Sequence, residues 1–174
     1  MKSLYFSGFC LQNDKELFKE YLENSDFNIS GFSYGSIKAM KYTLLQIKNN
    51  KRVQKLQLFS PAFFQDKDKK YKRLQLMFFK KNEDIYKNNF IKNISIPNNI
   101  ELDKYLTNGK YEELDILLNY EWNKDDFNFI LEAGVKIEVF LGSDDQIINS
   151  QKALEFFRQF AEVYYIKNVG HILK

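Results

Sequence analysis

The sequence predicts an α/β protein built on a mostly parallel sheet of about five strands with helices on both faces. Short apolar segments of strand length alternate with longer segments whose apolar residues recur at three- and four-residue spacing. The alternation stops once, between about residues 62 and 134, where helix-like patterns follow one another. A chain of 174 residues has room for one domain. We therefore expect a single domain, 1–174, with a helical cap insertion, about 62–134, over one edge of the sheet.

The first part of the chain predicts a strand, a helix and a second strand. Residues 3–8 are short and aromatic and end in glycine, which is typical of a strand that runs into a loop. Asn13 or Asp14 can cap the helix that follows. The apolar residues of that helix are Leu17, Phe18, Tyr21 and Leu22. Residues 27–32 form the second expected strand.

A helix packed on the sheet and a third strand are expected next. Between residues 36 and 48 the apolar positions fall on one helical face. These positions are Ile37, Met40, Leu44 and Ile47. Residues 56–59 predict a strand that Ser60-Pro61 ends, because proline cannot continue a central ladder.

Several short helices are expected in the insertion, and the strand pattern then resumes. The helical patterns fall at 74–78, 85–90, 102–106, 111–120 and 127–131, with breaks at 98–99 and 108–109. A strand at 135–141, a helix at 153–160 and a last strand at 163–166 complete the order. In such sheets ligands bind beyond the carboxyl ends of the strands, so the candidate site residues should lie there.

Composition excludes several classes of function. One cysteine and one histidine rule out an internal disulfide and a Cys/His zinc cluster. A metal site could come only from carboxylates, and none is suggested; we expect neither a metal nor a cofactor. A net charge of +3 is too small to indicate nucleic-acid binding. No stretch approaches the ~20 apolar residues of a membrane span, and no signal-peptide pattern follows Met1. We expect a cytoplasmic protein that binds neither nucleic acid nor membrane; the sequence leaves its oligomeric state open.

A Gly-x-Ser-x-Gly pattern lies between the second expected strand and the helix after it. Its residues are Gly31-Phe32-Ser33-Tyr34-Gly35. In a tight turn of this kind, side chains at either glycine would collide with the neighbouring strand or helix. The pattern alone also fits an ordinary glycine-serine turn, but its place between strand and helix indicates the nucleophile elbow of an α/β-hydrolase. Ser33 is therefore the predicted nucleophile, and it needs a base to take its proton.

His171 is the only histidine, and it follows the last predicted strand. A single histidine near a chain end is commonly a surface residue. The order serine, acid, histidine is nevertheless that of α/β-hydrolases, which place the base on the loop after the final strand. An imidazole there can accept the serine proton and return it to a leaving group. We predict that His171 is the base.

The acid should come from the loop 142–148, which contains two aspartates. Asp145 is favoured over Asp144, because Gly-x-x-Asp followed by a polar and then apolar residues is the usual hydrolase arrangement. Its role would be to hold the histidine tautomer and stabilise the imidazolium. The other aspartate is then a solvated loop carboxylate.

An oxyanion hole needs two backbone N–H groups that point at the developing charge. The expected donors are the amides of Tyr34, directly after the nucleophile, and of Phe9, in the loop after the first strand. Many hydrolases carry His-Gly-aromatic-Gly in that loop, whereas this chain has Ser7 and Cys10 on either side of its Gly-Phe pair. Cys10 is an alternative nucleophile, but no second base is present to serve it.

Over nearly its whole length the chain resembles the short pimeloyl-[acyl-carrier protein] methyl ester esterases of the biotin pathway, the BioV type. The segments that carry the resemblance are Phe6-Ser7-Gly8-Phe9, Ser30-Gly31-Phe32-Ser33-Tyr34-Gly35-Ser36-Ile37-Lys38-Ala39, Leu58-Phe59-Ser60-Pro61, Lys72-Arg73-Leu74-Gln75-Leu76, Gly134-Val135-Lys136-Ile137-Glu138-Val139-Phe140 and Gly170-His171. The resemblance implies hydrolysis of the methyl ester at the far end of a pimeloyl chain on acyl-carrier protein. It implies a serine carboxylesterase with Ser33, Asp145 and His171 as its triad, and no cofactor.

The insertion carries an excess of positive charge that would suit an acidic carrier protein. Between residues 66 and 92 there are nine basic and four acidic side chains. We expect contacts to acyl-carrier protein from Lys69, Lys70, Lys72, Arg73, Lys80 and Lys81. The alternative is a solvated helix face. Apolar residues interleaved with these, which would line an acyl tunnel or belong to the core, are Leu74, Leu76, Phe78 and Phe79.

Two other functions stay open on the sequence. One is a hydrolase of small free esters or thioesters, for which the basic insertion has no role. The other is a hydrolase-like binding module without catalysis, which the complete set Ser33, Asp145 and His171 disfavours.

Overall fold

A computed structural model describes residues 4–23 and 25–174 of the chain and contains one five-stranded sheet. All neighbouring strands are parallel, in the order β1-β2-β3-β4-β5. The strands are β1 (Leu4–Phe6), β2 (Asn28–Phe32), β3 (Lys55–Phe59), β4 (Lys136–Gly142) and β5 (Glu162–Ile166). The α/β fold class and the succession of five strands along the chain are as predicted. Ser3, at the start of the first expected strand, lies outside the described residues.

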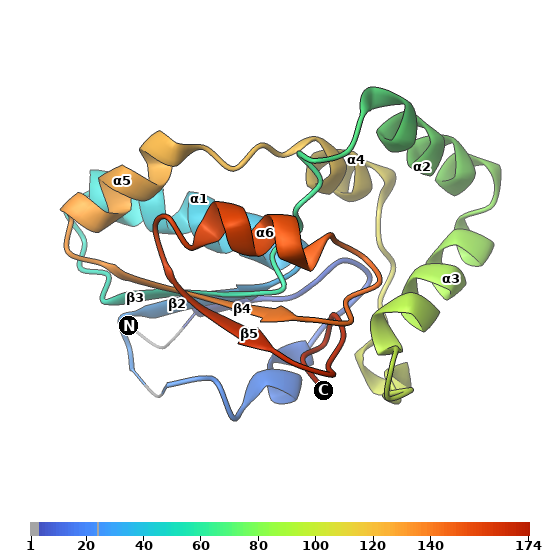
Figure 1. The fold of residues 1–174 in the computed structure, drawn as a ribbon, viewed down its shortest axis with the longest axis horizontal. Coiled ribbons are helices and arrows are strands. Elements are labelled where there is room, and N and C mark those ends of the chain that lie inside the picture. Colours follow the sequence, from blue (N-terminus) through green and yellow to red (C-terminus); the bar gives the residue numbers. More distant parts are fainter. Residues whose placement is uncertain (1–3, 24) are drawn as a thin grey trace.

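Three helices cover one face of the sheet: α1 (Tyr34–Lys48), α5 (Lys124–Glu132) and α6 (Ser150–Phe157) (Figure 1). Side chains alternate along a strand, so every second residue of the buried central strands points toward these helices. The strand residues in this first core cluster include Ile29, Leu56, Leu58, Ile137 and Val139. They pack with the apolar face of α1, including Ile37 and Met40.

The other face is covered by η1 (Asp14–Phe18), a short 3-10 helix. The prediction of an α-helix there is wrong, and so is its cap. Asn13 adopts a left-handed backbone without a side-chain hydrogen bond to the helix. The Asp14 carboxylate instead accepts from the Gly8 amide, away from the helix end. The strands are parallel and follow one another across the sheet in chain order. A connection that crosses the second face therefore has the opposite handedness to one that crosses the first face, so the β1–β2 connection differs in hand from the other three.

A second core cluster lies under η1, near the carboxyl ends of the strands. Phe18 stacks on Phe59 with ring centroids 4.8 Å apart and also contacts Phe32. Ile172 and Leu173, which follow His171, are buried in the same cluster. The end of the chain is thereby packed against the part of the sheet where β2 and β3 finish.

Toward the amino ends of the strands, the second face carries buried charge. Lys55 donates to Glu138 at 2.8 Å and also contacts Glu23. Burial raises the pKa of the Glu138 carboxyl, but hydrogen bonds from Lys55, Lys136 and Gln57 outweigh burial, so the pKa is lowered overall. This half of the face is therefore polar, whereas the half nearer the carboxyl ends is aromatic.

Most of the helical segment 62–134 lies beyond the carboxyl ends of the strands (Figure 1). It contains α2 (Lys69–Lys81), α3 (Glu83–Ser95), η2 (Asp103–Tyr105) and α4 (Tyr111–Asn119). The patterns expected at 74–78 and 85–90 are parts of longer helices, because Asp68 and Asn82 cap α2 and α3 through their side chains. The pattern at 127–131 is α5, which packs on the sheet with α1.

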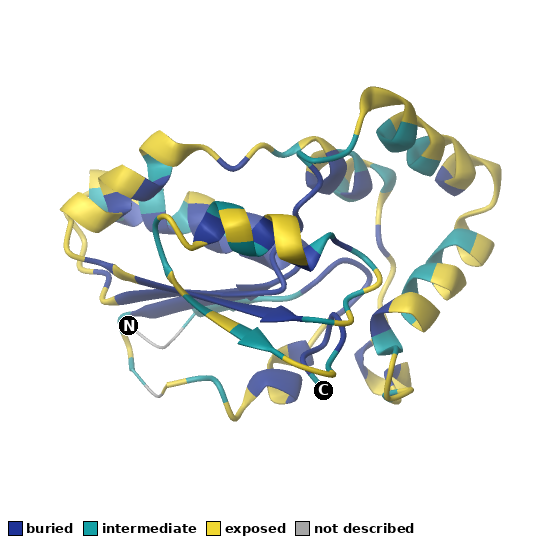
Figure 2. Ribbon diagram, viewed as in Figure 1, coloured by how far each residue is buried: buried dark blue, intermediate teal, exposed yellow. Residues whose placement is uncertain are grey.

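More than half of the residues of α2 and of α3 are exposed, whereas the central strands are buried (Figure 2). Phe78 on α2 and Ile85 on α3 are 55% and 59% exposed. No helix among the described residues is long and apolar enough to cross a membrane.

Candidate active site

Ser33 lies in a strained turn between β2 and α1. Its backbone has φ 52° and ψ −115°, a combination that costs a non-glycine residue on the order of 1–3 kcal/mol. A side chain at Gly31 would collide with the backbone of Gly35, and a side chain at Gly35 would collide with the backbone of Phe6. The Ser33 amide donates to the Phe59 carbonyl at 2.9 Å. The turn therefore has the sterics predicted for a nucleophile elbow, and the two glycines permit it.

His171 contacts Ser33 directly. The distance from His171 Nε2 to Ser33 Oγ is 2.9 Å, although the residues are 138 positions apart in the chain. The imidazole is 0% exposed and lies beside the Phe32 ring, with centroids 5.1 Å apart. The alternative of a surface histidine does not hold, since Ile172 and Leu173 are buried in the second core cluster with the loop after β5.

Asp145, and not Asp144, faces the imidazole. Asp145 Oδ2 lies 2.6 Å from His171 Nδ1. Its other oxygen accepts from the amides of Ile147 and Ile148, at 2.7 and 3.1 Å. Asp144 is exposed and its carboxylate accepts from the Ser143 hydroxyl. The structure therefore assigns the contact with the histidine to Asp145.

The loops that carry Asp145 and His171 are tied together by backbone hydrogen bonds. The Ser143 amide donates to the Ile166 carbonyl at 2.9 Å, and the Asp144 amide donates to the Val169 carbonyl at 3.0 Å. These bonds continue the pairing of β4 with β5 beyond the sheet. They fix the distance between the two side chains.

The two contacts of His171 define the imidazole tautomer that the site favours. An ionised carboxylate can only accept a hydrogen bond, so the proton of a neutral imidazole lies on Nδ1. Nε2 is then free to accept from the Ser33 hydroxyl. The arrangement can draw a proton from Ser33 Oγ, and Asp145 stabilises the imidazolium that forms.

Two backbone amides near Ser33 are available as oxyanion donors. Tyr34 is the first residue of α1, where the N–H groups of a helix have no partner within the helix. The Phe9 amide lies in the loop after β1. In the described part of the chain, neither N–H donates to a protein group. Both predicted donors are thus free to bind a negative oxygen.

Asp14 is a residue of this site that the sequence did not reveal. It is 0% exposed, and its Oδ2 accepts from the Gly8 amide at 3.0 Å and from the Tyr5 hydroxyl at 3.3 Å. Gly8 directly precedes Phe9 in the loop of the expected oxyanion donor. The sequence gives no signal of this role, because Asp14 stands among polar residues, Gln12-Asn13 and Lys15-Glu16, where an aspartate fits a helix cap.

Cys10 does not have the properties of a nucleophile. The thiol is buried, and burial raises its pKa to about 11 despite the opposing effects of the Gly109 backbone and Lys87. Only a thiolate is strongly nucleophilic, so Cys10 stays unreactive near neutral pH. These properties fit a small buried residue of the loop and not a nucleophile.

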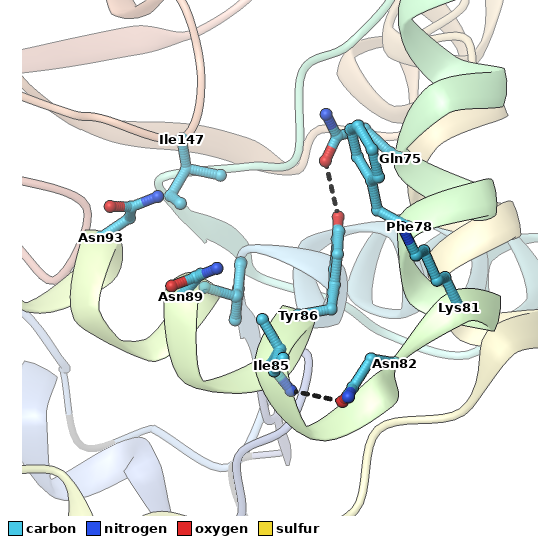
Figure 3. A pocket seen from close by; sticks show the side chains of 10 residues that line it. Gln75, Phe78, Lys81, Asn82, Ile85, Tyr86, Asn89, Asn93 and Ile147 are labelled. Carbon is cyan, nitrogen blue, oxygen red and sulfur yellow. Dashed lines mark hydrogen bonds between the residues drawn. The ribbon is translucent and has the colours of Figure 1, made fainter.

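Two neighbouring cavities lie among the helices beyond the strand ends. The outer cavity has a volume of about 590 Å³ and is lined by residues of α2 and α3, including Phe78 and Ile85 (Figure 3). The inner cavity, of about 180 Å³, is lined by Phe9 of the oxyanion loop and by Gln146 beside Asp145. Residues that line both cavities are Gln75, Tyr86, Phe90, Asn93 and Ile147.

Two of the residues that line both cavities, Tyr86 and Gln75, are joined by a hydrogen bond. The Tyr86 hydroxyl donates to Gln75 Oε1 at 2.9 Å, which joins α3 to α2 across the space between them (Figure 3). Burial raises the pKa of the Tyr86 hydroxyl, so it remains a donor. Of the four apolar residues considered for an acyl tunnel, Phe78 lines the outer cavity, whereas Phe79 is buried in the core against the Phe9 ring.

The six basic residues expected to meet a carrier protein all lie on α2 or its ends. Five are exposed and Lys72 is half-buried. Among the described residues none of the six forms an ion pair with an acidic side chain. Lys81 also lines the outer cavity. Residues 4–23 and 25–174 contain no group of three or more His, Cys, Asp or Glu side chains that could hold a metal ion.

Solved structures share this arrangement of elements, although no known family profile and no curated protein sequence matches the chain. A hydrolase from Oleispira antarctica aligns with a TM-score of 0.68 and 12% identity over 99% of this chain and 85% of its own. Naproxen esterase from Bacillus subtilis aligns with a TM-score of 0.61 and 15% identity, over 98% and 77%. BioG from Haemophilus influenzae aligns with a TM-score of 0.59 and 14% identity, over 98% and 88%. At these identities the comparison shows only that the chain shares the α/β fold of these structures.

Proposed function

We propose that the protein is a serine carboxylic ester hydrolase. The observation that carries the proposal is the continuous contact from Ser33 Oγ to His171 Nε2 and from His171 Nδ1 to Asp145, with distances of 2.9 and 2.6 Å. Nucleophile, base and orienting acid within hydrogen-bond distance form the arrangement that acyl transfer through a serine requires. The α/β-hydrolase fold and the strained Ser33 turn support the same function.

In the first half of the reaction, Ser33 Oγ attacks the ester carbonyl carbon while its proton passes to His171 Nε2. The carbonyl oxygen becomes negative and receives hydrogen bonds from the Phe9 and Tyr34 amides. The bond between the carbonyl carbon and the alcohol oxygen then breaks. His171 returns its proton to that oxygen, the alcohol leaves, and an acyl group remains on Ser33.

In the second half, water replaces the alcohol. His171 takes a proton from the water, whose oxygen attacks the acyl carbon, and the same two amides bind the oxyanion. Collapse breaks the bond to Ser33 Oγ, which recovers its proton from His171. A carboxylic acid is released and the enzyme returns to its starting state.

For the substrate, we propose the methyl ester of pimeloyl-acyl-carrier protein, hydrolysed to the free carboxylate and methanol. The sequence resemblance to pimeloyl-[acyl-carrier protein] methyl ester esterases supports this assignment. The cavities near the site support it as well, because apolar side chains such as Phe90 and Ile147 suit an aliphatic chain. The basic residues of α2, which have no acidic partners in the described chain, suit an acidic carrier.

Mass spectrometry of methyl-pimeloyl carrier protein tests the substrate directly. We expect the carrier to lose the mass of one methylene group on incubation with the protein, and the rate to fall as salt rises. Replacing Lys69, Lys70 and Arg73 with glutamate should lower kcat/KM for the carrier-bound ester about tenfold or more at low salt, since electrostatic steering is lost. Hydrolysis of the free dimethyl ester should not change.

A control set of charge reversals uses two lysines far from the site. Lys48 and Lys51 are exposed at the amino-end side of the sheet, and their replacement with glutamate should leave both substrates unaffected. An unchanged carrier mass, with a wild-type protein that hydrolyses free esters, would overturn the substrate assignment and leave a small-ester hydrolase. Equal effects of the two sets of charge reversals would remove α2 as the docking helix.

The Tyr86–Gln75 contact should control the length of acyl chain that the enzyme accepts. Tyr86→Ala removes a side chain that lines both the inner and the outer cavity, so a longer chain can extend from one into the other. We expect the ratio of kcat/KM for a long-chain to a short-chain methyl ester to rise about tenfold, in line with the 1–3 kcal/mol that a methylene group contributes in an apolar pocket. Steady-state kinetics on a series of free methyl esters measures this ratio.

Tyr86→Phe is the matched control, because it keeps the ring and removes only the hydroxyl. The ring continues to line both cavities, so the chain-length preference should shift much less than in Tyr86→Ala. A preference that stays at the wild-type value in Tyr86→Ala would show that the acyl chain does not pass between the two cavities.

A further inference from the structure

The loop of the expected oxyanion donor is held from both sides at Gly8. On one side, the Gly8 amide donates to Asp14 Oδ2 at 3.0 Å. On the other, the Gly8 carbonyl accepts from the Leu11 amide at 3.2 Å, which closes the turn. The peptide unit between these bonds leads directly to the Phe9 amide. With Gly8 held in this way, the Phe9 amide keeps one direction and has no partner among the described residues.

Packing alone does not explain why the Asp14 carboxylate is buried. Asp14 is 0% exposed, and its Oδ1 has no hydrogen-bond partner among the described groups. Burial raises the pKa of the Asp14 carboxyl, and hydrogen bonds from Ser7 and Gly8 oppose that rise. Leu17 and Phe18 on the same short helix are apolar and buried, so an apolar side chain would suit this place better. The role of the Asp14 carboxylate therefore lies in its hydrogen bonds, which it forms with the loop 7–8 and with the Tyr5 hydroxyl.

We propose that Asp14 is a positioning residue of the oxyanion hole, which acts by fixing the Gly8 peptide so that the Phe9 amide points at the carbonyl oxygen of the substrate. The inference rests on the proposed ester hydrolysis at Ser33. Asp14 does not touch the substrate in this role. Its contribution should appear in transition-state binding, because the negative oxygen forms only there.

Two substitutions separate this role from simple packing. Asp14→Leu keeps nearly the same shape and removes the acceptor, whereas Asp14→Asn keeps an oxygen that can accept from the Gly8 amide. We expect Asp14→Leu to lower kcat for p-nitrophenyl butyrate about 10²-fold with little change in KM, the size of effect that follows loss of one oxyanion donor. Asp14→Asn should recover most of that loss.

The inhibition constant of a transition-state analogue is a measurement that would not change if Asp14 had a structural role alone. A trifluoromethyl ketone adds Ser33 Oγ to its carbonyl carbon and forms a tetrahedral oxyanion. Its inhibition constant should rise in Asp14→Leu by the same factor as kcat/KM falls. Circular dichroism verifies that each variant is folded. If Asp14→Leu does not fold, Asp14→Ser is measured in the same way, because its side chain is too short to reach the Gly8 amide.

Tyr5→Phe is the matched control. It removes the other hydrogen bond to the same carboxylate oxygen and leaves Gly8 paired, so kcat should stay close to the wild-type value. A folded Asp14→Leu protein with wild-type kcat, or one that binds the trifluoromethyl ketone as tightly as the wild type, would overturn the inference. A wild-type protein without esterase activity would instead contradict the proposed function, so the two failures are distinct.

Discussion

Ser33→Ala should lower kcat for ester hydrolysis on the order of 10⁴–10⁶-fold, the effect of removing the nucleophile from a serine triad. The substitution deletes the oxygen that lies 2.9 Å from His171 and leaves no atom to form the acyl-enzyme. Binding of substrate should change little, because the cavities among the helices are lined by other residues. Steady-state kinetics on p-nitrophenyl butyrate measures the loss.

A fluorophosphonate probe identifies the reactive atom independently of any substrate. The wild-type protein should be labelled once, at Ser33, and Ser33→Ala should not be labelled, although Cys10 is still present. Labelling that persists in Ser33→Ala would show that another residue is the nucleophile. A wild-type protein that does not react would favour a hydrolase-like binding module without catalysis.

Asp145→Asn should lower kcat on the order of 10⁴-fold while the fold stays intact. Asparagine can present its NH₂ group to His171 Nδ1, which places the imidazole proton on Nε2. The histidine then cannot accept from Ser33. Loss of the negative charge also removes the stabilisation of the imidazolium. Kinetics at a fixed pH, with thermal unfolding as the measure of folding, tests this expectation.

The adjacent aspartate provides the control within the same loop. Asp144→Asn removes an exposed carboxylate that contacts Ser143 and not His171, so activity should stay close to the wild-type value. If the two substitutions have equal effects, the acid is not Asp145 in the working enzyme. If Asp144→Asn alone is inactive, the loop 142–148 takes a different conformation during turnover.

The sequence predicted the order of strands along the chain and the contact of Ser33, Asp145 and His171. The physical reasons for both are local. Strand and helix periods mark the elements, and parallel strands bring their carboxyl ends to one edge of the sheet. Ser33, Asp145 and His171 each follow a strand, so they converge even though they are far apart in the chain. The local pattern Gly-x-x-Asp favoured Asp145 over Asp144, and in the structure Asp145 is the aspartate that contacts the histidine.

The parts that the sequence did not predict depend on contacts between distant residues. Asp14 is of a residue type that commonly caps helices, and only the position of the Gly8 loop shows what its carboxylate binds. The short helix that begins at Asp14 is a 3-10 helix, and its apolar residues Leu17 and Phe18 pack in the second core cluster. Likewise, Phe78 and Phe79 are adjacent in sequence, but one lines a cavity and the other is core, since successive residues of a helix point in different directions.

The second core cluster links two halves of the site that the chain keeps far apart. Phe18, on the short helix that carries Asp14, packs in the same cluster as Ile172 and Leu173, which hold His171 in place. Hydrogen exchange in proteins shows that such a cluster opens cooperatively, as one unit with its own free energy. We therefore expect the general base and the anchor of the oxyanion loop to detach and return together. An opening of that unit switches off proton transfer and charge stabilisation in one step, while the sheet and its three covering helices remain folded.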